Sequence, residues 1–381
     1  MIKKHLINIL GWKTDRKIVV FESDDWGAIR MPSKAVFNSL KKKGYPLENC
    51  PYNNFDSLES NKDLECLFDV LDSVKDKNGQ SSIFTLNNIV ANPNFEKIKE
   101  SDFQSYYFEP FIDTLNRYPS HDKVYELYQK GIEEKLIKPQ FHGREHLQVN
   151  RWIDALQRKE VPVLDAFQHN FFSPKIRYSH DYPMEYMDAL DYDSIDELTG
   201  QKKIVSEGLK LFKDIWSFSS KSFIAPCYTW DSQLEECLLE NGVHYLQGVV
   251  AQQIPTAQSG YDRKLKFHYQ GQKNQLGQRY LVRNAFFEPT LYPQKDWVGE
   301  CMKRISIAFK WKKPAIIGSH RLNYTGSLDP KNRDTNLRGL RSLLDEIVKL
   351  WPSVEFYSSD QLGLEMDKKK EAFTHNANLN E

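Results

Sequence analysis

The chain has 381 residues, 40% of them hydrophobic and 13% aromatic, which is enough for one large α/β domain or two modest ones. Lys plus Arg and Asp plus Glu both number 52, so the formal net charge is zero, and a nucleic-acid partner, which normally requires a basic excess, is not expected. The five cysteines are widely spaced without a CxxC pair, which is typical of reduced thiols in a cytoplasmic protein.

The N-terminus, MIKKHLINILGWKTD, has a basic start but an apolar stretch too short for a secretion signal. No window approaches the roughly 20 apolar residues of a membrane span, so no transmembrane segment is expected. A peripheral membrane contact through the first dozen residues stays open. We expect a cytoplasmic protein, and the sequence does not predict its oligomeric state.

Short apolar runs then alternate with amphipathic helical patterns. Residues 261–290 break the alternation and indicate a β-hairpin or a long loop around Gly271 and Gly277. Segments 43–60, 90–120 and 171–200 are interpreted as insertions that shape a substrate cleft. The expected strands are residues 17–21, 81–88, 138–142, 221–226, 243–248, 314–320 and 354–359, and the expected helices are 59–79, 118–136, 149–160, 208–220, 229–242, 295–313 and 332–351.

A strand followed by a helix, about seven times over, predicts a parallel sheet with helices outside it. Open and closed sheets cannot be separated by this pattern alone. No GxGxxG follows the first strand and no GxxxxGK[ST] occurs, so the usual nucleotide-binding reasons for an open sheet are absent and a barrel-like sheet is favoured. We expect one domain over residues 1–366 and a polar, frayed tail over 367–381.

Polar residues follow several of these strands, where barrel enzymes carry their chemistry. Asp24 and Asp25 end the first expected strand, and His142 and His146 follow the third. Two neutral imidazoles and one carboxylate form an open site for Zn²⁺ or another divalent ion. Adjacent carboxylates diverge, so one can bind the metal while the other acts as a base. They cannot be the facing acid pair of a glycosidase.

ESDDWG, FHGREH, FIAPCYTW and IIGSHRLNY, in that order, resemble the motif series of the polysaccharide deacetylase family, which are metal-dependent carbohydrate esterases. The resemblance spans roughly residues 17–360, and its first two motifs are the specific part. It implies a distorted (β/α)7 barrel with loop insertions and an enzyme that removes N- or O-acetyl groups from sugars.

The resemblance also implies a role for each matching residue. Asp25, His142 and His146 would bind the divalent metal, with Zn expected first and Co, Ni or Fe as alternatives. The catalytic residues would be Asp24, the general base that activates water, His320, the general acid for the leaving group, and Cys227, whose backbone N–H would stabilise the oxyanion.

Three departures from the family pattern bear on the site. Ile224 stands where the family has an arginine that pairs with the catalytic aspartate, and either Arg144 or Arg283 could supply that charge. Gly318 replaces the leucine of the last motif. The segment 283–289 is the candidate for the fourth motif, with Arg283 and Glu288 as supporting groups that could equally form a structural ion pair.

Aromatic residues beside these motifs suit either sugar stacking or core packing. The expected substrate-binding residues are Trp26, Arg144, Tyr228, Trp230, Arg283 and Glu288. The first hypothesis is a divalent-metal hydrolase that removes an acetyl group from a carbohydrate or sugar conjugate. The alternatives are a hydrolase of another non-peptide C–N bond, and a non-catalytic carbohydrate-binding protein with a structural metal.

Overall fold

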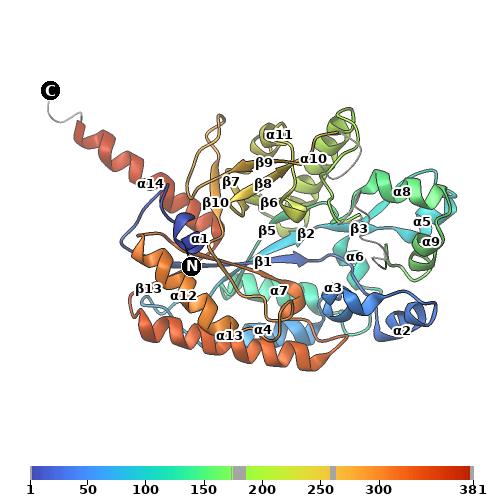
Figure 1. Ribbon diagram of the computed structural model, residues 1–381, viewed down its shortest axis with the longest axis horizontal. Helices are drawn as coiled ribbons and strands as arrows, with labels where there is room; N and C mark the ends of the chain where they lie inside the picture. Colours follow the sequence, from blue (N-terminus) through green and yellow to red (C-terminus); the bar gives the residue numbers. More distant parts are fainter. Residues whose placement is uncertain (1, 173, 175–185, 258–262, 378–381) are drawn as a thin grey trace.

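The computed structural model describes residues 2–172, 174, 186–257 and 263–377, and Figure 1 shows a central sheet surrounded by helices. Within these ranges no helix combines the length and the apolar character needed to cross a membrane. The five cysteines are all described and none forms a disulfide.

A parallel sheet forms the centre, in the order β10–β7–β6–β5–β2–β1–β12–β11, and β13 also pairs with β1. Two small antiparallel pairs, β3–β4 and β8–β9, lie outside this order. The strands are β1 (Lys17–Trp26), β2 (Phe84–Ile89), β3 (Ala91–Pro93), β4 (Phe108–Pro110), β5 (Ile137–Gly143), β6 (Ser222–Ile224), β7 (Tyr245–Gly248), β8 (Ala251–Ile254), β9 (Lys264–Phe267), β10 (Arg279–Val282), β11 (Ala285–Phe286), β12 (Ala315–His320) and β13 (Val354–Tyr357).

The two ends of this order, β10 and β11, are consecutive parts of one chain run, residues 279–286. β10 pairs with β7, and β11 pairs with β12. Between them, Arg283 N donates to Gly248 O at 2.8 Å and Asn284 N donates to Ile316 O at 3.1 Å, so the run is bonded on both sides. The sheet therefore closes through this run into a distorted (β/α)7 barrel, which confirms the expected fold class.

The alternation of side chains along β1 separates two environments. Val19 and Phe21 point outward into the large core under the helices. Ile18 and Val20 point into the barrel, where they pack with Leu362 of α14. The next inward residues along the strand are Glu22 and Asp24, both buried. The barrel interior is thus apolar at one end and charged at the other.

Helices cover the outside of the barrel, and several shorter ones gather beyond the end of the β1 arrow, at the right of Figure 1. The α-helices are α1 (Ile2–Leu6), α2 (Lys34–Lys42), α3 (Pro51–Phe55), α4 (Asn61–Asp72), α5 (Phe95–Glu100), α6 (Phe111–Leu115), α7 (Val124–Glu133), α8 (Val149–Gln157), α9 (Val161–Phe167), α10 (Glu197–Trp216), α11 (Leu234–Glu240), α12 (Trp297–Lys310), α13 (Pro330–Leu350) and α14 (Ser359–Ala377), with 3-10 turns η1 (Leu47–Asn49), η2 (Pro226–Tyr228) and η3 (Arg321–Asn323).

Two of the differences from the expected elements concern the closure of the barrel and the C-terminal tail. Residues 261–290 were expected to be a hairpin or loop; 264–267 do pair with β8, but 279–286 is the run that closes the barrel. α14 continues to Ala377, so this part of the expected tail is helical. The division into a domain over 1–366 and a tail stays a prediction.

Candidate metal centre

Asp25 lies at an irregular point of β1. The pairing of β1 with β2 changes register between Ser23 and Trp26, and Asp25 has φ +77°, a left-handed conformation that is strained for a non-glycine residue. In a regular strand, Asp24 and Asp25 would point to opposite faces. The bulge lets both carboxylates line one cavity. Strain at this position is therefore the means by which two neighbouring acids reach one site.

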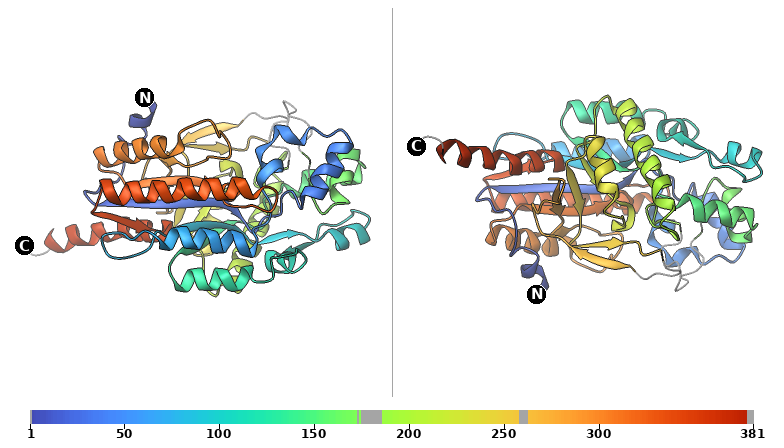
Figure 2. Two further views of the ribbon diagram at one scale, coloured as in Figure 1. Left: turned by 90° about the horizontal axis from the view of Figure 1, so that it is seen from below. Right: turned by 90° about the horizontal axis from the view of Figure 1, so that it is seen from above.

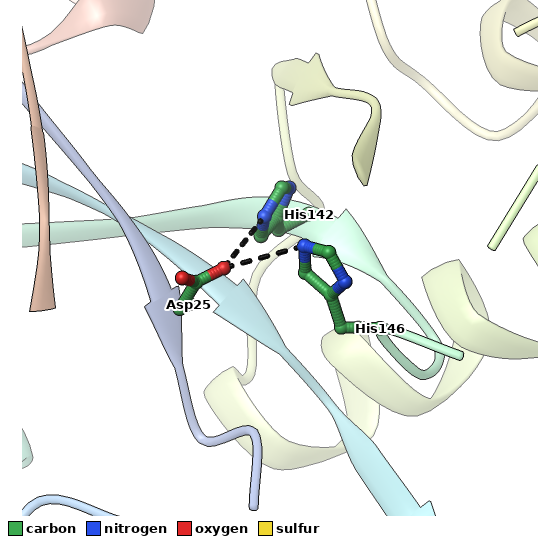
Figure 3. A group of neighbouring side chains, drawn as sticks. All are labelled: Asp25, His142 and His146. Carbon is green, nitrogen blue, oxygen red and sulfur yellow. Dashed lines mark ion pairs between the residues drawn. The ribbon is translucent and has the colours of Figure 1, made fainter. Parts of the chain in front are cut away.

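His142 and His146 lie at the end of β5 and in the loop after it, and both face Asp25 (Figure 3). His142 Nδ1 lies 2.9 Å from the carbonyl oxygen of Ile224, which can only accept, so Nδ1 carries a proton and Nε2 is the nitrogen that could bind a metal. Burial lowers the pKa of His146 to about 3, so this imidazole is neutral at physiological pH. Neutral imidazoles are the form that binds metals.

The three side chains fit a divalent ion by their spacing. His142 Nε2 and His146 Nε2 lie 3.5 and 3.4 Å from Asp25 Oδ1, and the ligand atoms all lie within 4.8 Å of one another. Ligands at the usual zinc distances in a tetrahedral arrangement would be about 3.3 Å apart. Within the described ranges no other group of His, Cys, Asp and Glu meets this test.

Asp24 is held by hydrogen bonds from Asn87 on the neighbouring strand β2 and from Arg283 of the closing run. Arg283 donates to both carboxylate oxygens, at 2.6 and 2.7 Å, and Asn87 Nδ2 donates to Oδ1 at 2.7 Å. Burial alone would raise the pKa of Asp24, but the Arg283 guanidinium lowers it below its usual value, so the carboxylate is ionised. Of the two arginines proposed for this role, the structure places Arg283 there.

Arg283 has a second buried partner that the sequence did not indicate. Its Nε donates to Glu22 Oε2 at 2.7 Å, and Ser359 Oγ donates to the other Glu22 oxygen at 2.7 Å. Gly318 makes room for this arginine, because a Cβ there would lie 2.8 Å from Arg283 Cδ. Gly318 and Arg283 are therefore two parts of one arrangement.

His320, at the end of β12, lies opposite Asp24 with Nε2 3.7 Å from Oδ2. Its Nδ1 is 2.6 Å from Glu288 Oε1, and Asn323 Nδ2 donates to the other Glu288 oxygen at 2.8 Å. Burial would lower the pKa of His320, but Glu288 and Asp24 raise it to about 10. At neutral pH this imidazole is a cation, and Glu288 forms an ion pair with it.

These groups open into one cavity of about 300 Å³. Cys227 and Tyr228 line it at the end of β6, both with positive φ, which turns the backbone of η2 at this point. The Tyr228 hydroxyl accepts from Arg283 Nη1 at 3.1 Å. Residues from two expected insertions, 43–60 and 171–200, also line the cavity, whereas none from 90–120 does; positions 173 and 175–185 are outside the described residues.

Three expected substrate-binding residues lie elsewhere. The indole of Trp26 is buried in the large core and donates to Ser23 Oγ at 2.9 Å. Trp230 is buried in the same core and stacks on His268. Arg144 pairs with Glu145 and Glu207, away from the cavity. An aromatic or arginine beside a motif does not reveal which face of the chain it occupies, and none of these three side chains lines the cavity.

Among the residues that line the cavity, sequence reasoning missed Arg30 and Tyr52, which contact the predicted ones. Arg30 follows β1 and places Nη2 3.6 Å from Asp25 Oδ2, and its guanidinium lies over the ring of Tyr52. Tyr52, from α3, meets His320 edge-on with ring centroids 5.9 Å apart. Arg30 could have been suspected from its place after the first motif, whereas Tyr52 lies in an insertion without any motif.

No protein-family model matches the chain, and neither does any curated protein. Solved structures similar to it include two proteins described as polysaccharide deacetylases. For the one from Mycobacterium smegmatis, identity is 10%, coverage is 95% of this chain and 94% of the other, and the TM-score is 0.44. For the one from Pseudomonas aeruginosa, the values are 8%, 92%, 90% and 0.44.

An allantoinase is also similar, at 9% identity over 95% of this chain and 92% of that one, with a TM-score of 0.43. Similarities at this level of sequence identity and TM-score do not show which reaction, if any, this chain catalyses. The geometry of the site is what bears on the chemistry of this chain.

Proposed function

We propose that this protein is a divalent-metal-dependent hydrolase that removes an acyl group, in the first place acetyl, from a carbohydrate. One observation carries the proposal: the ligand atoms of Asp25, His142 and His146 meet beside an ionised carboxylate and a protonated imidazole. A structural metal site has no need of the last two groups.

The three ligands would hold Zn²⁺ first, with Co, Ni or Fe as alternatives. A bound divalent ion would polarise the acyl carbonyl and lower the pKa of water in the cavity. Asp24 would accept the proton of the attacking water, because its carboxylate is ionised and lines the cavity. Arg283 and Asn87 would keep this carboxylate from turning away or binding the metal itself.

His320 would donate a proton to the leaving amine or alkoxide. Its partner Glu288 keeps the imidazole charged and fixes Nδ1, so that Nε2 faces the cavity side on which Asp24 lies. The environments of the base and the acid therefore shift their pKa values in opposite directions. The Arg283 cation lowers the pKa of Asp24, and the Glu288 anion raises that of His320.

The backbone N–H of Cys227 would donate to the negatively charged oxygen that develops from the acyl carbonyl when water attacks its carbon. The left-handed turn at Cys227, which lines the cavity, favours this assignment. Tyr228 lines the same wall and would contact the sugar. A carbohydrate or sugar conjugate inside the cell would be the substrate, in keeping with the cysteine usage.

The first test is elemental analysis of wild type, His142→Ala and His244→Ala, a matched variant of an exposed histidine. We expect one divalent ion per chain in wild type and His244→Ala, and none in His142→Ala. The metal-loaded wild type should release acetate from acetylated sugars, and His142→Ala should not.

Two results would redirect the proposal. Metal binding with turnover of other amides but no acetate release would favour hydrolysis of a different C–N bond. Tight sugar binding without turnover in any metal would favour a binding protein. If wild type binds no metal after reconstitution, the proposed metal-dependent reaction is contradicted.

A further inference from the structure

Three segments far apart in sequence lie on one side of the barrel: residues 2–16 with α1, residues 263–280 with β9, and residues 292–313 with α12. Both views of Figure 2 place α1, α12 and the β8–β9 pair on this side. We call the exposed side chains of these three segments the basic–apolar face. It lies outside the metal centre, none of whose ligands it contains.

The basic–apolar face concentrates positive charge in a chain of zero net charge. The three segments contain 15 Lys or Arg and only three Asp or Glu, which leaves 37 basic and 49 acidic residues for the rest. Eight of the 15, all lysines, and two of the three acids, Asp15 and Asp296, are exposed and so belong to the face. Of those three acids, Glu300 already pairs with Lys4 and Asp15 with Lys312. The exposed lysines here are Lys3, Lys13, Lys264, Lys273, Lys295, Lys303, Lys310 and Lys312.

The same segments hold eight of the fourteen large apolar side chains that are exposed in the described ranges. Leu265 and Phe267 alternate along β9, so they share one face of that strand, and they are 56% and 65% exposed. Leu6 and Leu10 are 56% and 60% exposed. Clustering of this kind marks an interaction surface, whereas single exposed leucines do not.

Contacts join the segments into one surface. Trp12 N donates to Gln270 O at 2.8 Å, and Gly11 lies so near Tyr269 that a Cβ would be 2.8 Å from its ring. Lys4 binds Glu300 of α12. Residues 4–12 therefore contact the chain that follows β9 on one side and α12 on the other.

We propose that the basic–apolar face binds the surface of an anionic membrane. Lysines attract acidic lipid headgroups, and leucine and aromatic side chains between them can enter the boundary of the acyl chains. Aliphatic residues favour this occupant over nucleic acid, because leucines offer no stacking surface for bases. Docked in this way, the enzyme would act beside the membrane while its metal centre stays accessible.

The test uses the full chain in sedimentation with vesicles of phosphatidylcholine, with or without phosphatidylglycerol. We expect binding only to the anionic vesicles, weakening as salt rises. Lys3→Gln/Lys264→Gln/Lys295→Gln should weaken binding by at least about tenfold, since each lysine near the surface contributes about 1 kcal/mol. Leu10→Ser/Phe267→Ser should weaken it similarly at constant charge.

Matched controls lie on other elements. Lys62→Gln/Lys99→Gln/Lys130→Gln removes as many exposed lysines, and Val161→Ser removes an apolar side chain that is 67% exposed on α9. Neither should change vesicle binding, and no variant should change the metal content. Absence of binding to anionic vesicles, equal losses in test and control variants, or capture of duplex DNA instead of vesicles would each overturn the proposal.

Discussion

Because Gly318 has no side chain, the side chain of Arg283 has room to lie against it. A methyl group there would meet Arg283 Cδ at 2.8 Å, and this arginine holds Asp24 and Glu22 together inside the barrel. Gly318 has an ordinary backbone conformation, so its role is one of space, not of φ.

We therefore expect Gly318→Ala to destabilise the protein by about 1–3 kcal/mol, as overpacking does, and to lower kcat more than it changes KM. Chemical denaturation and steady-state kinetics measure the two effects. Gly200→Ala is the matched control, because a Cβ there meets open space and alanine is the better helix former. Unchanged kcat in Gly318→Ala would contradict the positioning of Asp24 by Arg283.

The pKa of His320 gives a second prediction at this scale. In the metal-free protein this imidazole should stay protonated until the pH nears about 10. Because the pKa is raised on folding, its contribution to stability is complete below the unfolded value of about 6.5 and is lost as pH rises towards 10. Glu288→Gln should lower the pKa by more than about one unit, since the anion is removed.

NMR titration of the His320 ring in wild type and Glu288→Gln measures this shift. The control is Glu300→Gln, which removes a carboxylate that pairs with Lys4 and Arg304 instead. If His320 titrates near its ordinary value in wild type, Glu288 is not what keeps it charged, and the assignment of His320 as acid loses its support.

The grouping of Asp25, His142 and His146 could be predicted because its signal is local: an acid pair after one strand and histidines four apart after another. The contact of Arg283 with Asp24 joins residues 259 positions apart and depends on the register of the closing run, so the sequence left Arg144 as an equal alternative. Trp26 and Trp230 were misplaced because size and aromaticity favour a core as much as a sugar.

At the scale of elements, the start of α14 fills one end of the barrel. Leu362 and Met366 pack on the inward residues Ile18, Tyr245 and Leu281. Just before them, Ser359 binds Glu22, so the same helix supports both the apolar end and the charged interior.

We expect Leu362→Ala to cost about 2–5 kcal/mol of unfolding free energy, because it leaves a cavity under a closed ring of strands. Leu364→Ala, two residues on and 51% exposed, should stay within about 0.5 kcal/mol of wild type. Denaturant unfolding of both variants compares them directly. Equal losses would mean that α14 does not seal the barrel.

Most strands were predictable because burial on both faces gives them continuous apolar runs. The run 279–286 was not recognised as a barrel strand. It follows a turn-rich stretch with Gly271 and Gly277, and Arg283 and Asn284 interrupt its apolar residues. Arg283 binds Asp24, and the backbone N–H groups of Arg283 and Asn284 bond to the two neighbouring strands. These polar residues break the apolar pattern by which a buried strand is recognised in a sequence.

At the scale of the whole molecule, the net charge does not show where the charged residues lie on the surface. A net charge of zero argued against a polyanionic partner, yet 15 of the 52 basic residues lie in the three segments of the basic–apolar face. Such a separation is invisible until the fold brings residues 2–16, 263–280 and 292–313 to one side.

The closing run also affects the order in which parts of the structure form during folding. Arg283 can reach Asp24 only when residues 279–286 have joined β7 to β12, and contacts across such sequence separations form late. A nascent or partly refolded chain could acquire most of its helices and still lack the Arg283 guanidinium beside Asp24. Catalytic competence would then appear after bulk secondary structure during refolding, and a chain that never closes its ring would remain inert.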